Sequence, residues 1–265
     1  MSKHFELMQE MEKERQSSTR VVSTPVVSSE NEPPLGRSTP VFSSESESEP
    51  RTGPGRTRWA NEEALRLVQQ IFLLQSQQVP RVVVFAGIEH GNGCTQICTS
   101  VAETLAKHSM KPVCLVDANF RSPALPEMYG TRNHHGLTDA LLGEGPIGSF
   151  AKRVNDDDLW LLSCGKLAAD SPNLFTSERL GERLLELRHD FEFVIIDAPP
   201  LTDYSDAVVL GQHSDGMVMV LEANSTRREA AAAAAASLRS VNVPILAAVL
   251  NKRTFPIPEK IYNRL

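Results

Sequence analysis

The chain has 265 residues, with 27 Lys plus Arg against 33 Asp plus Glu and a formal net charge of −6. This acidic balance argues against nucleic acid as a partner, because such binding requires a basic surface. No apolar run approaches the ~20 residues of a membrane span, and no cleavable signal is recognised at the N-terminus. The four cysteines form no CxxC pair, so neither a zinc site nor a disulfide framework is indicated. We expect a cytoplasmic protein.

The first 56 residues differ in composition from the rest. Residues 1–16 place Phe5, Met8 and Met11 at helical spacing, which predicts a short amphipathic helix, either a docking element or a marginal helix without a partner. Residues 17–56 are mostly Ser, Pro, Glu and Thr and cannot bury enough apolar surface to offset the entropy of ordering. We expect a disordered linker there, followed by a folded domain over residues 57–265.

In that domain, patterns typical of helices and strands alternate. Residues 60–76 predict an amphipathic helix. Apolar runs predict buried strands at Arg81–Ala86, Pro112–Asp117, Leu159–Ser163, Phe193–Asp197, Gly216–Leu221 and Pro244–Leu250. Helices are expected between them at Thr95–Lys107, Leu137–Leu142, Ser177–Arg188, Asp203–Gln212 and Thr226–Ser240. Together these predict a three-layer α/β fold, a mostly parallel sheet with helices on both faces.

The first predicted strand leads through a glycine-containing loop into a helix, which is the context of a phosphate-binding loop. Gly91 and Gly93 allow backbone N–H groups to approach an anion closely, and Thr95 stands where a hydroxyl binds Mg²⁺. The usual Gly-Lys-[Ser/Thr] triplet is broken, however, because Cys94 takes the place of the lysine. From the loop alone, a plain tight turn is an equal alternative.

Two further predicted strands end in polar residues. One runs into Asp117, Asn119 and Arg121, and another ends at Asp197 before a Pro-Pro turn. Ligands of parallel sheets bind at the carboxyl ends of the strands, so two carboxylates beside a glycine loop favour a magnesium-nucleotide site. For either aspartate alone, helix capping is an equal alternative. Asn251 follows the last strand, where its amide suits a nucleotide base or a turn.

The order and wording of these segments resemble the bacterial tyrosine kinases (BY-kinases, CpsD/CapB type), deviant-Walker P-loop NTPases related to the MinD/ParA proteins. The resemblance covers roughly Asn61 to Lys252, with VVVFAG…HGNGCT as Walker A, VCLVDANFRSP as Walker A′ and FVIIDAPP as Walker B. It implies ATP or ADP and Mg²⁺ as cofactors. The implied cofactor-binding residues are Gly91, Asn92, Gly93, Cys94, Thr95, Gln96, Arg121 and Asn251. The implied metal ligands are Thr95, Asp117 and Asp197, and the implied catalytic positions are Asp117, Asn119 and Asp197.

The sequence departs from the family pattern at residues that the family uses for phosphate binding, metal binding and phosphorylation. Cys94 replaces the Walker A lysine, and Asn119 replaces the second aspartate of Asp-x-Asp-x-Arg. The tail offers Tyr262 alone where the family has a tyrosine cluster. Cys94 is either a reactive thiol of lowered pKa at a helix N-terminus or a small residue that fills the vacated space. Lys107 and Lys111 are alternative sources of the missing charge, although neither lies in the loop.

Three functions follow from this resemblance. We expect first a catalytically impaired pseudokinase, a regulatory or assembly partner in exopolysaccharide production. Its implied partner is the cytoplasmic face of a membrane polysaccharide co-polymerase, which would place it at the inner membrane. The alternatives are an active protein-tyrosine autokinase and a MinD/ParA-like positioning ATPase. Self-association is implied through the family's ExxRxxR motif, which here reads Glu63, Arg66 and Gln69.

Overall fold

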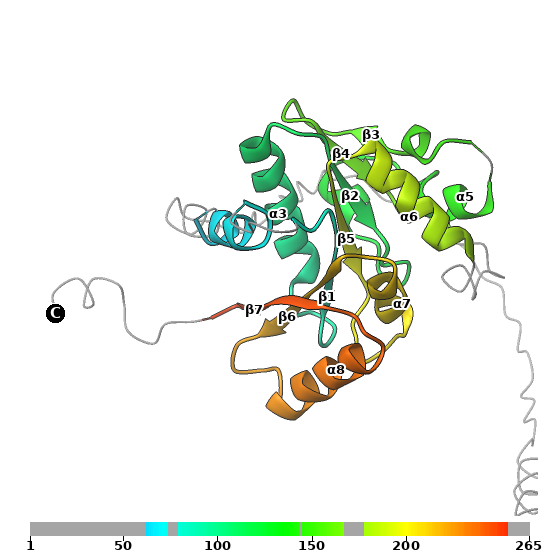
Figure 1. Cartoon of the computed structure of the whole chain (residues 1–265). Coiled ribbons are helices and arrows are strands. Elements are labelled where there is room, and N and C mark those ends of the chain that lie inside the picture. The colour runs from blue at the N-terminus through cyan, green and yellow to red at the C-terminus, as the bar shows by residue number, and fades with distance from the viewer. Residues whose placement is uncertain (1–61, 74–78, 144, 167–177, 254–265) are drawn as a thin grey trace, which may run out of the picture. The chain divides into compact units, whose positions relative to one another are not determined.

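A computed structural model describes residues 62–73, 79–143, 145–166 and 178–253. The expected helix over residues 1–16, the expected linker over residues 17–56 and Tyr262 lie outside them. In the described part, seven strands form one sheet in the order β3-β4-β2-β5-β1-β6-β7 (Figure 1). Every pairing is parallel except that of β3 with β4.

The elements agree with most of the predicted ranges. The strands are β1 (Val82–Gly87), β2 (Val113–Asp117), β3 (Lys152–Arg153), β4 (Leu159–Leu162), β5 (Phe193–Ala198), β6 (Gly216–Glu222) and β7 (Ile245–Asn251). The helical segments are residues 62–68, the π-helical η1 (Gln69–Leu73), α3 (Cys94–Ser109), α4 (Leu125–Met128), α5 (Leu137–Leu142), the 3₁₀ turn η2 (Ile147–Phe150), α6 (Glu178–Asp190), α7 (Asp206–Gln212) and α8 (Arg228–Ser240). The short elements β3, α4 and η2 were not predicted.

Helices cover both faces of the sheet, as predicted. Alternate residues of β1 point to opposite faces, as in any strand. Val82, Val84 and Ala86 join a core formed with α5, α6, α7 and α8. Val83 and Phe85 join a second core formed with α3 and the helical residues before β1. Figure 1 shows α3 on one side of the sheet and α5, α6 and α7 on the other. The predicted three-layer α/β architecture is therefore confirmed.

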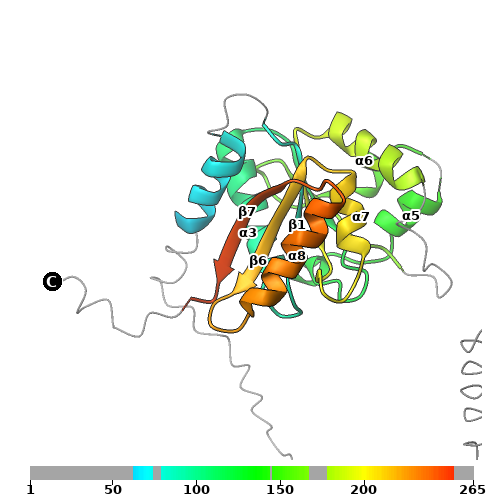
Figure 2. The ribbon, with the colours of Figure 1, turned by 60° about the horizontal axis from the view of Figure 1, so that its bottom comes forward.

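The last strand is more open than its apolar sequence suggests. No residue of β7 is fully buried, and Leu250 is 57% exposed. β7 is an edge strand beside β6 (Figure 2), and Leu238 is the only buried residue of α8, which packs near it. The prediction of a buried final strand was wrong, because an edge strand has one neighbour and the alanine side chains of α8 cover little surface.

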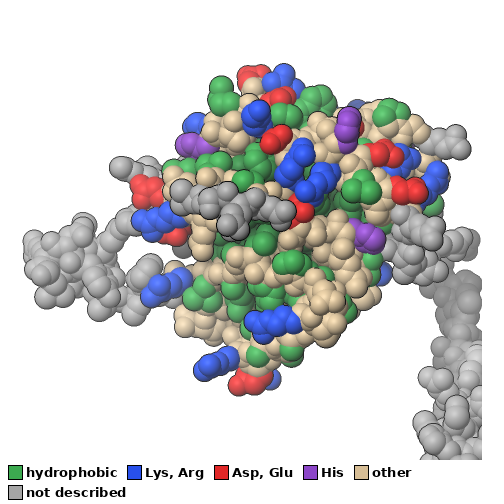
Figure 3. All heavy atoms as spheres, viewed as in Figure 1, with side chains coloured by type: hydrophobic (Ala, Val, Ile, Leu, Met, Phe, Trp, Pro, Cys, Tyr) green, Lys and Arg blue, Asp and Glu red, His purple; other side chains and the backbone are tan. Residues whose placement is uncertain are grey.

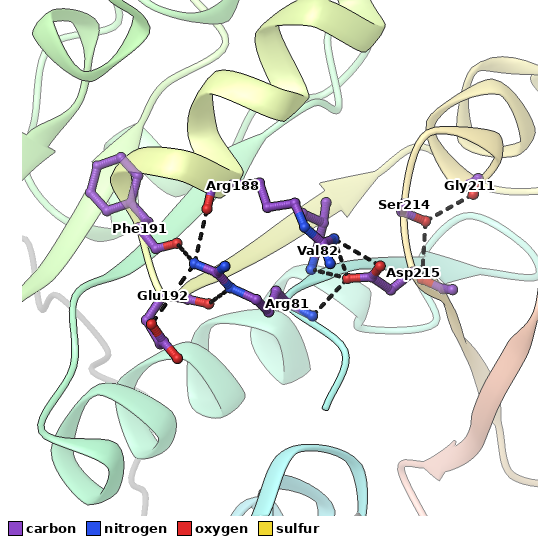
Figure 4. A network of polar contacts seen from close by, with 9 residues as sticks. Arg81, Val82, Arg188, Phe191, Glu192, Gly211, Ser214 and Asp215 are labelled. Carbon is purple, nitrogen blue, oxygen red and sulfur yellow. Dashed lines mark hydrogen bonds and ion pairs between the residues drawn. The ribbon is translucent and has the colours of Figure 1, made fainter. Parts of the chain in front are cut away.

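A polar network ties the start of β1 to the end of α6 (Figure 4). The Arg81 guanidinium donates to three carbonyl oxygens at the end of α6, at 2.9–3.0 Å. Asp215 accepts the backbone N–H of Arg81 and Val82 and pairs with Arg188 at 2.7 Å. Burial raises the pKa of Asp215, but these N–H donors and Arg188 lower it more, so it lies below its usual value. The network holds the amino-terminal edge of the sheet.

The surface carries charges of both signs. On the face shown in Figure 3, lysine and arginine side chains are interspersed with aspartates and glutamates. Among the described residues, no helix is long and apolar enough to cross a membrane.

Candidate functional site

The loop between β1 and α3 has the backbone of an anion-binding loop. Gly91 and Gly93 both have φ of 81°, in the left-handed region that favours glycine. A Cβ at Gly93 would meet Nδ2 of Asn251, so another residue there would displace the Asn251 amide as well as strain the backbone. Asn92 is 3% exposed, and its Oδ1 accepts the backbone N–H of Glu89 at 2.8 Å. The loop is therefore shaped by its glycines and closed by Asn92.

Two carboxylates lie side by side where β2 and β5 end. Asp117 and Asp197 are register partners, and they are 0% and 1% exposed. Asp117 accepts the backbone N–H of Asn119 at 3.2 Å and of Leu125 at 3.3 Å. Burial and then the charge of Asp197 raise the pKa of Asp117 to about 7. None of the ion pairs within the described ranges involves either carboxylate.

Asp197 is also the partner of the first turn of α3. The Thr95 hydroxyl donates to Oδ2 of Asp197 at 2.6 Å. Oδ1 of Asp197 is buried without a hydrogen-bond partner. Burial raises the pKa of Asp197 to about 6, although the Thr95 hydroxyl and the Cys94 thiol lower it. A buried carboxylate oxygen without a protein partner fits a site that binds a polar or cationic ligand.

Cys94 faces the same carboxylate. Burial, followed by the charge of Asp197, raises the pKa of the Cys94 thiol well above its usual value. A reactive thiolate requires the opposite shift. The raised pKa favours the interpretation of Cys94 as a small residue in the space of a lysine over that of a reactive thiol.

The remaining predicted site residues are less directly engaged. Oδ1 of Asn119 accepts the backbone N–H of Ser122 at 3.3 Å, which turns this side chain into its own loop. The Arg121 guanidinium lies over the Tyr204 ring, 4.8 Å from its centroid. Gln96 is exposed on the first turn of α3. Asn119 contacts Asp117 through its backbone N–H, but the described contacts of the Asn119 and Arg121 side chains are with other groups.

Lys252, which was not predicted as a site residue, lies at the glycine loop. Its Nζ donates to the backbone oxygen of Gly91 at 2.7 Å and to Oε2 of Glu222 at 3.0 Å. Asn251, which was expected near a nucleotide base, donates from Nδ2 to the backbone oxygen of Asn92 at 2.9 Å. The only sequence signal was the position of Lys252 directly after Asn251, at the carboxyl end of a strand. No described contact brings Lys107 or Lys111 to the loop.

These residues fit a magnesium nucleotide in part. The glycine loop offers backbone N–H groups to phosphate, and Thr95 and Asp197 offer oxygen atoms to Mg²⁺. No group of three or more His, Cys, Asp or Glu residues within the described ranges could hold a metal ion. This is compatible with Mg²⁺, which usually keeps several waters and binds through few carboxylates and substrate phosphates. The misfit is the absent lysine.

Comparison with known proteins identifies homologues. No protein-family model matches the sequence. The tyrosine-protein kinase Wzc of Salmonella typhimurium is 31% identical over 157 residues, which is 59% of this chain but only 21% of that protein. The tyrosine-protein kinase YwqD of Bacillus subtilis is 29% identical over 161 residues, which is 61% of this chain and 68% of that protein.

Solved structures show the same fold. The chimerical protein CapA2B2 has a TM-score of 0.69 at 20% identity and covers 78% of this chain and 88% of its own. A ParA family ATPase from Chlorobium tepidum has a TM-score of 0.55 at 18% identity and covers 65% of this chain and 74% of its own. The chain is therefore a homologue of the bacterial tyrosine-protein kinases, built on the P-loop ATPase fold.

Proposed function

We propose that this protein binds a magnesium nucleotide weakly, transfers phosphate poorly or not at all, and acts as a regulatory or assembly protein. The observation that carries the proposal is the environment of Cys94. At the position of the P-loop lysine, a thiol of raised pKa faces Asp197. No described ion pair brings a lysine or arginine to that carboxylate in its place. The site therefore lacks the lysine ammonium that would neutralise the charge of the phosphate being transferred.

The residues that remain support binding more than turnover. Backbone N–H groups of the glycine loop hold phosphate without a lysine, and loss of one charge-assisted contact costs about 1.5–3 kcal/mol, or one to two decades of affinity. Phosphoryl transfer depends almost entirely on positioning and electrostatics, and a missing cation costs about 10³–10⁵ in rate by analogy with an arginine finger. We therefore expect measurable but weakened nucleotide binding and greatly reduced turnover.

The chain's own groups have limited chemistry to offer. Bound Mg²⁺ would supply charge neutralisation at the phosphate oxygens. Asp197 holds the Thr95 hydroxyl at 2.6 Å and so orients a metal-binding oxygen. Asp117, with a pKa of about 7, is poised to accept a proton near neutral pH. Asn119 has a neutral amide at the position of the family's second aspartate, whose negative charge would strengthen metal binding.

Asp117 favours the second candidate, an active tyrosine autokinase, because a buried base near neutral pH suits an attacking hydroxyl. The available tyrosines argue against it. The Tyr129 hydroxyl donates to Glu103 at 3.0 Å, and Tyr204 is stacked against Arg121. Both are half-buried, so Tyr262 is the remaining acceptor. A positioning ATPase of the MinD/ParA type is supported by the shared fold alone.

The biological setting comes from the resemblance. We place the protein in exopolysaccharide or capsule production, at the cytoplasmic face of a membrane polysaccharide co-polymerase. Self-association is supported by Glu63, Arg66 and Gln69, which are exposed along one row of the helix before β1. Glu63 and Arg66 pair with each other at 3.0 Å, with side chains 64% and 69% exposed. This pair remains accessible to a second copy.

The test combines ATP-binding calorimetry with Mg²⁺ and an ATPase assay. The proteins compared are the wild type, Cys94→Lys, Asn119→Asp and the double variant. Gln212→Lys serves as the matched control, because it adds the same charge at an exposed position outside the glycine loop. We expect turnover only in variants that carry Cys94→Lys, with the largest rate in the double variant. Wild-type turnover as fast as that of the double variant would contradict the proposal.

A second measurement addresses the autokinase directly. Labelled ATP is incubated with the wild type and with Tyr262→Phe, and phosphate incorporation is followed. We expect none in either protein. Incorporation that Tyr262→Phe abolishes would establish the autokinase instead.

A further inference from the structure

The last residue of β7, Asn251, and the next residue, Lys252, donate side-chain hydrogen bonds to two successive carbonyl groups of the glycine loop. Nζ of Lys252 donates to the backbone oxygen of Gly91 at 2.7 Å, and Nδ2 of Asn251 donates to that of Asn92 at 2.9 Å. Glu222 accepts a second bond from the same ammonium at 3.0 Å. Glu222 and Asn251 are register partners on β6 and β7, so the contact is anchored to the sheet.

These bonds fix the direction of backbone N–H groups. In a planar trans peptide the carbonyl and the following N–H point to opposite sides. Holding the Gly91 oxygen therefore turns the Asn92 N–H away from Lys252, and holding the Asn92 oxygen turns the Gly93 N–H away from Asn251. Within the described part of the chain, neither N–H donates to another backbone group. Positive φ at Gly91 and Gly93, but not at Asn92, is the alternation that directs N–H groups toward an anion.

The local geometry shows that these contacts are specific. Lys252 has a φ of 54°, which is uncommon for a residue other than glycine and persists only where surrounding contacts hold it. Its backbone N–H donates to Oδ1 of Asn251 at 2.8 Å, so the Asn251 amide is bonded at both ends. Nδ2 of Asn251 also lies so close to Gly93 that a Cβ there would displace the amide. Strand end and loop are therefore fitted to each other.

We propose that Asn251 and Lys252 are positioning residues that brace the glycine loop for the phosphates of a nucleotide. The proposal rests on the proposed nucleotide site and deepens it. It assigns the Asn251 amide to the loop rather than to the base. It also identifies Lys252 as a cation that contacts the backbone of the glycine loop, in a chain where Cys94 replaces the usual lysine of that loop. Because Lys252 bonds a carbonyl oxygen, it acts through the loop and not as a catalytic residue.

The first test needs no ligand. Hydrogen exchange of the Glu89 amide, which is bonded to Asn92, reports closure of the loop in the full chain. Lys252→Met and Asn251→Ala are each expected to speed this exchange about tenfold, the loss of one charge-assisted or amide bond. Lys111→Met is the matched control, because Lys111 is exposed in the turn before β2. Unchanged exchange in both loop variants, with an unchanged thermal midpoint, would overturn the brace.

The second test separates the brace from a base contact. Calorimetry compares magnesium ADP with magnesium pyrophosphate, which has the phosphates but no base. A brace weakens both ligands by the same factor, about five- to tenfold for each variant. Weakening of ADP alone by Asn251→Ala would assign Asn251 to the base and overturn its role here.

The two proposals fail in different ways. If the wild type binds neither ADP nor pyrophosphate, the proposed nucleotide function fails. Faster Glu89 exchange in the loop variants would still establish the brace, and unchanged exchange would refute it. If the wild type binds both ligands and the variants bind equally well, the nucleotide function stands and the brace is refuted.

Discussion

Replacement of Asp117 by asparagine is expected to stabilise the ligand-free protein at pH 8 and to change its stability little at pH 5. Asp117 is fully buried beside Asp197, and its pKa of about 7 lies above the ordinary 3.8. Between those values the folded state keeps a proton that the unfolded state has released. Stability therefore falls as pH rises from 4 to 7, and above pH 7 the full penalty of a buried charge is present.

The magnitude follows from the shift. A rise from 3.8 to about 7 corresponds to about 4 kcal/mol at 1.36 kcal/mol per unit. Asparagine has one acceptor oxygen for the two N–H donors at 3.2 and 3.3 Å, so one bond is lost at about 1–3 kcal/mol. The net gain at pH 8 is about 1–3 kcal/mol, or about 2–12 °C in thermal midpoint. At pH 5 the unfolded state has already released its proton, so the wild type carries about 1.6 kcal/mol of the penalty, and relief of that penalty roughly cancels the lost bond.

The assay is thermal and urea unfolding at pH 5 and pH 8, in EDTA and without nucleotide. Asp156→Asn is the matched control, because Asp156 is exposed. Its effect is expected to be small at both pH values. If Asp117→Asn changed stability by the same amount at pH 5 and pH 8, the buried carboxylate would carry no electrostatic penalty and the reasoning would be refuted.

Three further outcomes are expected. Asp215→Ala should lower the free energy of unfolding, measured in urea, by about 3 kcal/mol. The Asp215 carboxylate accepts hydrogen bonds from two backbone N–H groups and pairs with Arg188, and alanine leaves all three without this partner. Asp215→Asn should recover part of the lost stability. Gly93→Ala should abolish pyrophosphate binding in calorimetry, because its φ is 81° and its Cβ would meet Asn251; retained binding would contradict this. Cys94 should react with iodoacetamide at pH 8 far more slowly than glutathione, because its pKa is raised, and mass spectrometry of the labelled peptide shows whether it does.

The long elements of the fold were predictable because their side chains are buried on a regular pattern. The strands β1, β2 and β5 lie within about one residue of their expected ranges. β3 was missed because Lys152 and Arg153 are exposed and show no alternation; their strand exists only through antiparallel pairing with β4. β7 was misjudged in burial because its apolar sequence does not reveal that it lies at the sheet edge.

The candidate site divides in the same way. Strand-ending aspartates and a glycine loop were recognisable because parallel strands bring their carboxyl ends to one edge. The partners of side chains at that edge were not. Arg121 stacks on Tyr204, which is distant in sequence. The Asn119 side chain accepts a hydrogen bond from Ser122 in its own turn and so does not bond to the carboxylate pair.

The sequence by itself determined the layered α/β plan, the kinase resemblance and the two altered positions, Cys94 and Asn119. Each depends on local pattern or residue identity, which a sequence states directly. Only the tertiary structure decided that Cys94 faces Asp197 and that Nζ of Lys252 donates a hydrogen bond to the glycine loop. Lys252 and Gly91 are 161 residues apart, and the parallel order of β1, β6 and β7 is what brings them together. Such contacts follow from strand order, which local pattern does not encode.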